Sequence, residues 1–202
     1  MAAAAAAAEA AGYDGFNVPE TRHAAFVSLT PAASATNRIG LTSSIAVAFA
    51  RNPMSMAVLA NDIQLISGGR FRLGLGSQVR PHIGRRFAMP WSHPAARMEE
   101  FIAAIRAIWS SWATGERLAF RGTFYQHTLM TDFFNPGEFS TSRAVAQASR
   151  RNGNGLLILL QVQLRSAHVL PLHVEAEAPA RMARSKVLVP RPITPAQHLV
   201  YP

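Results

Sequence analysis

The chain has 202 residues, of which 49% are hydrophobic and 15% are charged, and this composition is typical of a globular domain and excludes a fully disordered chain. The absence of cysteine excludes a disulfide framework, a thiolate nucleophile and a cysteine-based metal site. No apolar run reaches the roughly 18 residues that a spanning helix needs, and the alanine-rich start lacks the basic region of a signal peptide, so we expect a cytoplasmic protein with no membrane partner.

The net charge of +9 is unevenly distributed along the chain. Residues 1–138 carry twelve arginines and nine acids, a net of +3, whereas residues 139–202 carry seven arginines and one lysine against two acids, a net of +6. Because lysine occurs once in the whole chain, the arginine content reflects a GC-rich coding sequence as much as selection for phosphate contacts. We expect no nucleic-acid partner, although a basic nucleic-acid-binding module remains a rival hypothesis.

The first part of the chain predicts a helix, a strand and a second helix. Residues 2–11 predict a helix that ends at Gly12, a residue suited to the left-handed position after a helix. Residues 13–19 alternate apolar and polar side chains, as a strand does. A loop over residues 20–23 then leads into a weak helical pattern that ends near Asn37.

The next strand and helix are better defined. Residues 39–47 are rich in small and β-branched side chains, which indicates a strand buried on both faces. Asn52 and Pro53 predict a helix start, as N-cap and first helical residue. The apolar stripe of this helix is Leu59, Ile63 and Ile66. The pair Gly68–Gly69 ends it.

Residues 70–76 predict a third strand, with Phe71, Leu73 and Leu75 on one face. After a loop, His93 and Pro94 open a long helix that Gly115 ends. Its apolar positions have helical spacing and are Met98, Phe101, Ile102, Ile105, Ile108, Trp109 and Trp112. We interpret both tryptophans as packing residues, and we place Glu99 and Glu100 on the solvent side. Residues 118–125 predict a hairpin around Gly122.

The alternation of strands and helices predicts βα units in a parallel sheet, that is, an α/β fold. The pattern stops near residue 138. Beyond it, acids nearly vanish and Arg, Ala and Pro dominate, with one apolar run at residues 156–164 that fits a strand or a helix. We therefore expect two regions: a folded domain at residues 1–138 and a basic, poorly ordered tail at residues 139–202.

The loop after the first predicted strand contains two candidate catalytic residues. His23 and Glu20 follow its carboxyl end, and in any α/β barrel that edge carries the active site. For His93, capping of the following helix is an alternative to catalysis. No histidine pair has metal-ligand spacing, and no serine lies in a G-x-S-x-G turn.

Gly74 and Gly76 end the third predicted strand, where glycine lets the backbone approach a ligand closely. A dinucleotide-binding fingerprint would carry a third glycine and open a helix at once. Here Val79 occupies that third position, and Pro81 follows soon after. By itself the glycine pair therefore indicates a tight turn.

Five segments carry a combined pattern that is more specific than any one of them. They are residues 12–16 (GYDGF), 19–23 (PETRH), 42–53 (TSSIAVAFARNP), 65–77 (LISGGRFRLGLGS) and 91–94 (WSHP). In this order they resemble the luciferase-like monooxygenase superfamily, and most of all its branch of coenzyme F420-dependent oxidoreductases.

The resemblance implies a (β/α)8 barrel of the bacterial luciferase type, with a deazaflavin or isoalloxazine ring across the carboxyl ends of the strands. Coenzyme F420 is the implied cofactor, with FMN as the alternative, and a small organic molecule is the implied substrate. The residues it assigns to the cofactor are Ser43, Ser44, Ile45, Gly74, Gly76 and Ser77. It also implies a cis peptide within residues 43–45 and places His23 above the ring as a proton donor or substrate contact. Intact members would form homodimers.

The resemblance covers residues 1–138, whereas a complete barrel needs about 250 residues. We therefore expect an incomplete (β/α)8 TIM-type barrel with two unpaired parallel edges, followed by a non-homologous tail. Our hypothesis is that the chain is a truncated or frameshifted gene product, which translation of its source DNA in the other frames would test. The predicted function is flavin- or deazaflavin-dependent hydride transfer or oxygen-dependent oxidation. Its first rival is a non-enzymatic barrel remnant.

Overall fold

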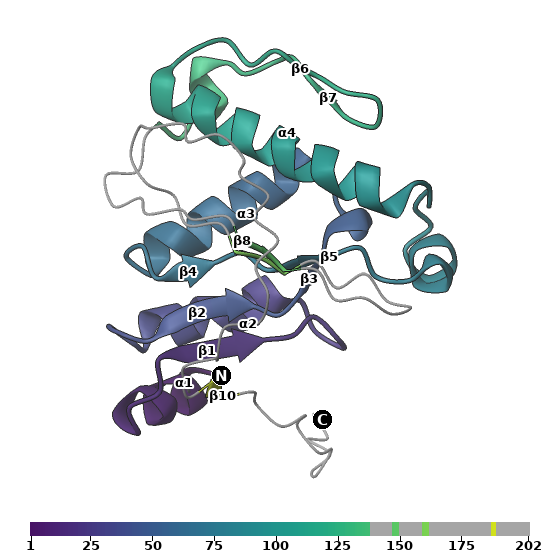
Figure 1. Ribbon diagram of the computed structural model, residues 1–202. Helices are drawn as coiled ribbons and strands as arrows, with labels where there is room; N and C mark the ends of the chain where they lie inside the picture. The colour runs from purple at the N-terminus through teal and green to yellow at the C-terminus, as the bar shows by residue number, and fades with distance from the viewer. Residues whose placement is uncertain (138–146, 150–158, 162–186, 189–202) are drawn as a thin grey trace, which may run out of the picture.

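The computed structural model describes residues 1–137 and the backbone of three short strands later in the chain (Figure 1). The rest of residues 139–202, where we expected a poorly ordered tail, lies outside the described residues. The helices are α1 (Ala2–Ala10), α2 (Ala25–Ser34), η1 (Ala48–Ala50), α3 (Pro53–Ile66), η2 (His82–Arg86), α4 (Pro94–Thr114) and η3 (Asp132–Phe134). The strands are β1 (Gly15–Val18), β2 (Gly40–Ser43), β3 (Ala46–Val47), β4 (Phe71–Arg72), β5 (Leu75–Gly76), β6 (Phe120–Arg121), β7 (Gln126–His127), β8 (Gln147–Ser149), β9 (Leu159–Gln161) and β10 (Val187–Leu188).

The central sheet is parallel and has the strand order β10–β1–β2–β4, while β3 and β5 form a second parallel pair. Helix α2 connects β1 to β2, and α3 connects β3 to β4, as expected for βα units. Because parallel strands all point the same way, the segments after β1, β3 and β5 leave the sheet at one edge (Figure 1). In α/β barrels this carboxyl edge carries the active site.

The strand expected at residues 39–47 is interrupted in the middle. The chain forms β2 before Ser44 and β3 after Ile45, and the peptide bond between Ser44 and Ile45 is cis. The structure thus confirms the position of the cis peptide that the resemblance implied. The expectation of a strand buried on both faces is wrong for β2, where buried and half-buried residues alternate.

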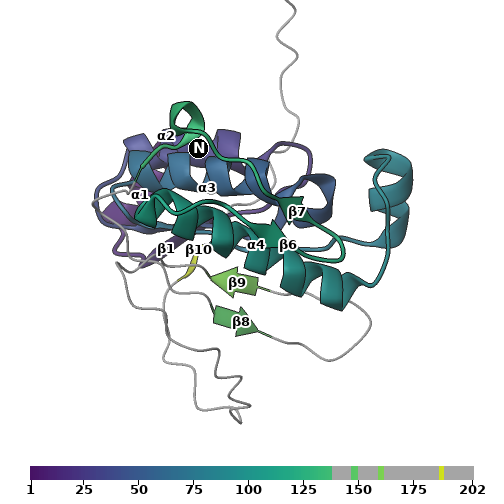
Figure 2. The same cartoon turned by 90° about the horizontal axis from the view of Figure 1, so that it is seen from above.

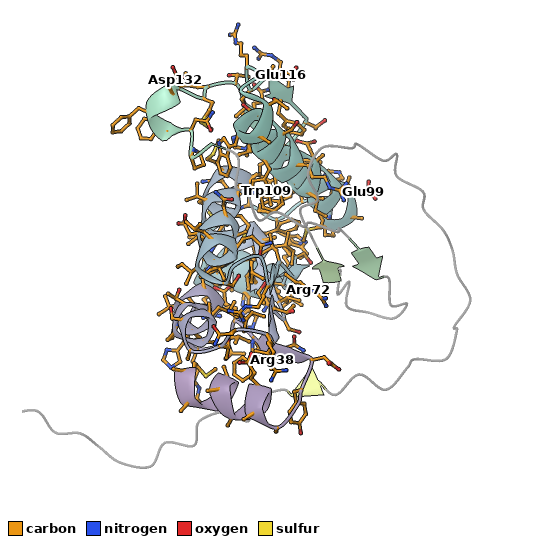
Figure 3. The ribbon with its side chains drawn as sticks, turned by 90° about the vertical axis from the view of Figure 1, so that its left-hand side faces the viewer. Arg38, Arg72, Glu99, Trp109, Glu116 and Asp132 are labelled. Atoms are coloured by element: carbon orange, nitrogen blue, oxygen red, sulfur yellow. The ribbon has the colours of Figure 1, made fainter. Side chains whose placement is uncertain are left out.

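The two faces of the sheet differ in burial. Phe16, Leu41 and Phe71 belong to the buried core, and Phe71 meets Phe26 of α2 at 6.2 Å between ring centroids. The opposite face carries half-buried residues, among them Thr42 and Arg72, which are paired in register. Figure 2 shows the helices on one side of the sheet and β8 and β9 on the other. Arg72 extends away from the helices in Figure 3.

Helical periodicity predicts the core faces with unequal success. All seven apolar residues expected to form the inner stripe of α4 are buried, and Gly115 ends that helix with φ of +72°. In α3 the expected stripe is partly wrong, because Ile66 is 44% exposed and Leu59 is half-buried. Ile63 is buried as expected, and the buried face continues through Met56 and Ala60.

One edge of the sheet differs from the expected pair of open edges. β10 lies parallel to β1, with Gly15 opposite Val187 and Phe16 opposite Leu188. The edge beside β1 is therefore paired by a strand from residues that we expected to be unstructured. No helix of the described residues is long and apolar enough to cross a membrane.

Candidate functional site

β2 and β3 meet at residues 43–45, which we call the joint. The side chain of Ser43 holds this joint in place. Its Oγ donates to the carbonyl oxygen of Gly74 and accepts from the backbone N–H of Gly74, both at 2.9 Å. Ser43 is fully buried. One hydroxyl therefore adds a side-chain link at the point where β4 gives way to β5, where the carbonyl oxygen of Gly74 also accepts from the backbone N–H of Ala46, and it fixes two of the predicted cofactor residues to each other.

Gly76 is required by a close contact with Ile45. A Cβ placed on Gly76 would lie 2.8 Å from both Cγ1 and Cδ1 of Ile45, which is closer than van der Waals contact allows. The side chain that follows the cis peptide is thus packed directly on the last residue of β5. The structure brings all six predicted cofactor residues together at the ends of β2, β3, β4 and β5.

Glu20 lies at this edge, but its carboxylate is already engaged. Oε1 pairs with Nη2 of Arg51 at 2.5 Å, and Oε2 accepts from Nη1 of Arg51 and from the backbone N–H of Val47, each at 2.8 Å. The side chain of Glu20 is 10% exposed. These contacts favour a role in holding the loop after β1 against β3, and the catalytic role expected from the sequence stays a prediction.

His23 lies in the same loop, directly before α2, and its side chain is exposed. It belongs to the carboxyl edge, as expected, and its imidazole faces solvent. The structure therefore places an exposed imidazole at this edge, and its catalytic role stays a prediction. His93 occupies the N-cap of α4 with φ of +38°, but its side chain makes no capping hydrogen bond.

The segment after β5 is more structured than expected. Residues 82–86 form a single π-helical turn, η2, within what we expected to be a loop. Nη2 of Arg86 donates to the carbonyl oxygen of Thr21 at 3.2 Å, so the loops after β1 and β5 touch. A single turn of five residues leaves no periodic pattern, so η2 was not predicted.

A buried arginine that sequence reasoning missed links the surroundings of the site. Arg97 of α4 is 6% exposed and lies over the Phe49 ring, with its Cζ 4.6 Å from the centroid. Its Nε donates to the hydroxyl of Tyr125 at 2.8 Å, and its Nη1 donates to the carbonyl oxygen of Pro90. Burial raises the pKa of the Tyr125 hydroxyl, against a smaller opposite effect of Arg97. Arg97 thus joins η1, the loop before α4 and the β6–β7 hairpin.

The placement of Glu100 on the solvent side of α4 is wrong. Its carboxylate accepts from the backbone N–H groups of Thr123, Phe124 and Tyr125 at 2.6 to 2.9 Å. Glu99 is exposed, as expected. Both tryptophans of α4 are buried packing residues, and Nε1 of Trp109 donates to Ala57 of α3 (Figure 3).

The arginine of the SGGRFRLGLG segment has a structural role. The guanidinium of Arg70 donates to the carbonyl oxygens of Ala33, Thr36 and Ile39, at 2.7 to 2.9 Å. It therefore binds the end of α2 and the start of β2, and burial lowers its pKa. Part of this motif thus serves the fold, while Gly74 and Gly76 are its predicted cofactor residues.

The groups at the carboxyl edge fit a flat cofactor better than a metal ion. Within residues 1–137 no cluster of three or more His, Asp or Glu side chains could hold a metal. Instead the edge offers glycine backbone, the Ser44–Ile45 peptide and an imidazole. Such a surface can support a ring and place a proton beside it, and redox chemistry would then belong to the cofactor.

Two solved structures share the fold. One is the oxygenating constituent of 3,6-diketocamphane monooxygenase from Pseudomonas putida, in complex with FMN, with a TM-score of 0.56 and 15% identity over 69% of this chain and 41% of that one. The other is the coenzyme F420-dependent tetrahydromethanopterin reductase from Methanopyrus kandleri, with a TM-score of 0.52 and 18% identity over 68% of this chain and 43% of that one. These likenesses support the luciferase-like barrel architecture.

Sequence relatives agree with this architecture. An uncharacterized Mycobacterium tuberculosis protein is 53% identical over 133 residues, which is 66% of this chain and 39% of the relative. A second protein of that organism, provisionally named a coenzyme F420-dependent oxidoreductase, is 33% identical over 52% of this chain and 30% of its own. The chain thus spans 39% of the length of the more similar of these two relatives.

The family model described as luciferase-like monooxygenase matches residues 1–197. The match continues past residue 138, where we expected the resemblance to end, so the expected non-homologous tail is not confirmed. The fold, the order of the motifs and this match agree, and the chain belongs to the luciferase-like monooxygenase family.

Proposed function

We propose that the chain carries the cofactor site of a flavin- or deazaflavin-dependent oxidoreductase, with coenzyme F420 as cofactor and FMN as the alternative. The observation that carries this proposal is the joint at the carboxyl edge, where Ser43 hydrogen-bonds to Gly74 and the side chain of Ile45 packs on Gly76. A ring laid across this edge would meet backbone and small side chains, which allow close approach.

Each residue of the site has a distinct part in the proposal. Ser43 fixes the joint, while Ser44 and Ile45 form the support behind the ring. Gly74, Gly76 and Ser77 line the neighbouring strand end, and their backbone accepts a close neighbour. His23 would hold or deliver a proton beside a small organic substrate. When bound, the cofactor supplies hydride transfer or, for FMN, oxygen-dependent oxidation.

Titration of the purified full chain with coenzyme F420 and, separately, with FMN tests the proposal, with fluorescence as the readout. We expect saturable binding of one of them with a Kd of about 1 µM to 100 µM, that is, roughly 5 to 8 kcal/mol. A folded sample that binds neither would favour the alternative of a non-enzymatic barrel remnant.

A pair of glycine variants locates the binding site. Gly76→Ala should displace Ile45 and weaken cofactor binding at least about tenfold, the equivalent of 1.4 kcal/mol. Gly15→Ala is the matched control, because its added methyl group would meet only a carbonyl oxygen of Gly40 at 3.9 Å, an ordinary contact. Equal affinities of the two variants, with unchanged far-UV circular dichroism, would contradict the placement of the ring at Gly76.

A further inference from the structure

The segment that follows β5 is basic and carries no acidic residue. Residues 77–98 contain four arginines and neither Asp nor Glu. Arg97 is buried, whereas Arg80, Arg85 and Arg86 are exposed. These three arginines lie in or directly before the η2 turn. One short segment that follows the carboxyl edge therefore carries all three positive charges.

The loop after β1 adds to this charge. Arg86 donates to the carbonyl oxygen of Thr21, and the next residue, Arg22, is exposed. The one acid of residues 19–24 is Glu20, whose charge is compensated by Arg51. We define the basic rim as Arg22, Arg80, Arg85 and Arg86. It carries four positive charges, and residues 19–24 and 77–93 contain no carboxylate other than the paired Glu20.

We infer that the basic rim binds the phosphate or carboxylate group of a small organic ligand at the mouth of the proposed cofactor site. This inference rests on the proposed function, since it names the charge of a molecule that enters that site. Guanidinium groups bind phosphate and carboxylate through two parallel hydrogen bonds. Like charges on two touching loops repel each other, and a bound anion removes that repulsion.

The anion can come from the cofactor or from the substrate. FMN and riboflavin carry the same ring and differ by one phosphate. A comparison of their affinities therefore shows whether the bound anion is the phosphate of the cofactor or a group of the substrate. Pyrophosphate, as a small dianion or trianion without a ring, reports on the rim alone. Attraction between exposed charges is screened over about 8 Å at physiological ionic strength, so binding through the rim should weaken as salt is added.

The test compares two double variants of the full chain that lose the same charge. Arg80→Ala with Arg85→Ala removes half of the rim, and Arg117→Ala with Arg121→Ala is the control. All four side chains are exposed, and none makes a side-chain hydrogen bond within the described structure. Binding is measured for pyrophosphate by calorimetry and for FMN and riboflavin by fluorescence, at two salt concentrations.

We expect the rim variant, and not the control, to bind pyrophosphate about tenfold more weakly. If FMN loses affinity in parallel while riboflavin does not, the rim holds the cofactor's phosphate. If the rim variant binds pyrophosphate more weakly while its affinities for FMN and riboflavin are unchanged, the rim holds the substrate's anionic group. Failure of every ring compound to bind, with pyrophosphate binding retained, would refute the proposed function and leave the rim as an anion site.

Equal pyrophosphate binding by both double variants would overturn the inference. So would a rim that binds no pyrophosphate but binds a DNA duplex with steep salt dependence, since that would make it a nucleic-acid contact.

Discussion

The hydroxyl of Ser43 makes two hydrogen bonds to Gly74 across the interrupted strands. The carbonyl oxygen of Gly74 also accepts from the backbone N–H of Ala46 at 2.8 Å, so replacement of Ser43 by alanine would leave only the N–H of Gly74 buried without its partner. Because an unsatisfied buried polar group costs about 1–3 kcal/mol, Ser43→Ala should lower the free energy of unfolding by about 1–3 kcal/mol.

Urea denaturation measures this loss. Ser110→Ala is the control, because Ser110 is exposed on α4 and its hydroxyl makes no hydrogen bond within residues 1–137. A destabilisation of Ser43→Ala no larger than that of the control would show that water or a rearranged backbone satisfies Gly74.

Single residues show where sequence reasoning stops. The motif at residues 65–77 predicts a functional strand end, and Gly74 and Gly76 do lie there. The partner of each glycine is more than 30 positions away in the sequence, at Ser43 and Ile45, so no local pattern reveals the contact. Arg97 was missed for a related reason, because an arginine in a helix suggests a solvated position until its aromatic neighbours are known.

The connection between α2 and β2 is held by a carboxylate from another element. The side chain of Glu9 in α1 accepts from the N–H groups of Asn37, Arg38 and Ile39 at 2.6 to 3.2 Å. These hydrogen bonds, that of Ile39 first, lower the pKa of Glu9 to about 2. A carboxyl group with a lowered pKa stabilises the fold above its ordinary pKa, and the stabilisation is lost as the pH falls toward 2.

The urea midpoint of Glu9→Gln should therefore lie below that of the wild-type protein at pH 7. The difference should stay constant down to about pH 5 and shrink between pH 4.5 and pH 2. Glu116→Gln is the control, since Glu116 is exposed and its carboxylate makes no hydrogen bond within the described part of the chain. A difference that does not depend on pH would assign the effect to packing.

The β6–β7 hairpin depends on a similar contact with Glu100. A methyl group on Gly122 would overlap the Glu100 carboxylate, which binds three N–H groups of the turn. Gly122→Ala should thus release the hairpin from α4 without unfolding α4, whose stripe is independently buried. We expect faster trypsin cleavage after Arg117 and Arg121 and an unchanged helical circular dichroism signal.

Gly84→Ala is the matched glycine control, because its methyl group would meet no atom within 4 Å. Cleavage rates that are equal in the two variants would mean that other contacts hold the hairpin.

Elements with strong periodicity were predictable and those without it were not. α4 has seven buried apolar residues at helical spacing, and both its start and its end were expected. The strands are only two to four residues long because β2 and β4 end at the joint, and that joint depends on contacts between distant residues. The π-helical turn η2 and the strand β10 were missed because segments this short carry no period.

The assembled molecule includes one pairing that joins distant parts of the chain. β10 covers the edge of the sheet beside β1, with Phe16 opposite Leu188. Leu188→Pro removes one backbone N–H group from β10 and constrains its backbone, and it should lower the free energy of unfolding by about 1 kcal/mol or more relative to Leu188→Ala. Alanine keeps the N–H group, so the difference between the two variants in urea denaturation isolates the backbone contribution.

A proline variant as stable as the alanine variant would contradict the β1–β10 pairing.

This pairing has a consequence for synthesis on the ribosome. β1 is made early, and its partner residue in β10 follows 172 positions later. At translation rates of about 5–20 residues per second, the N–H and carbonyl groups along that edge of β1 wait roughly 9 to 34 seconds for their partner. During this interval neighbouring nascent chains on one messenger RNA present the same open edge to one another. Slowed elongation after residue 137 would prolong that exposure and should raise the aggregated fraction of newly made protein.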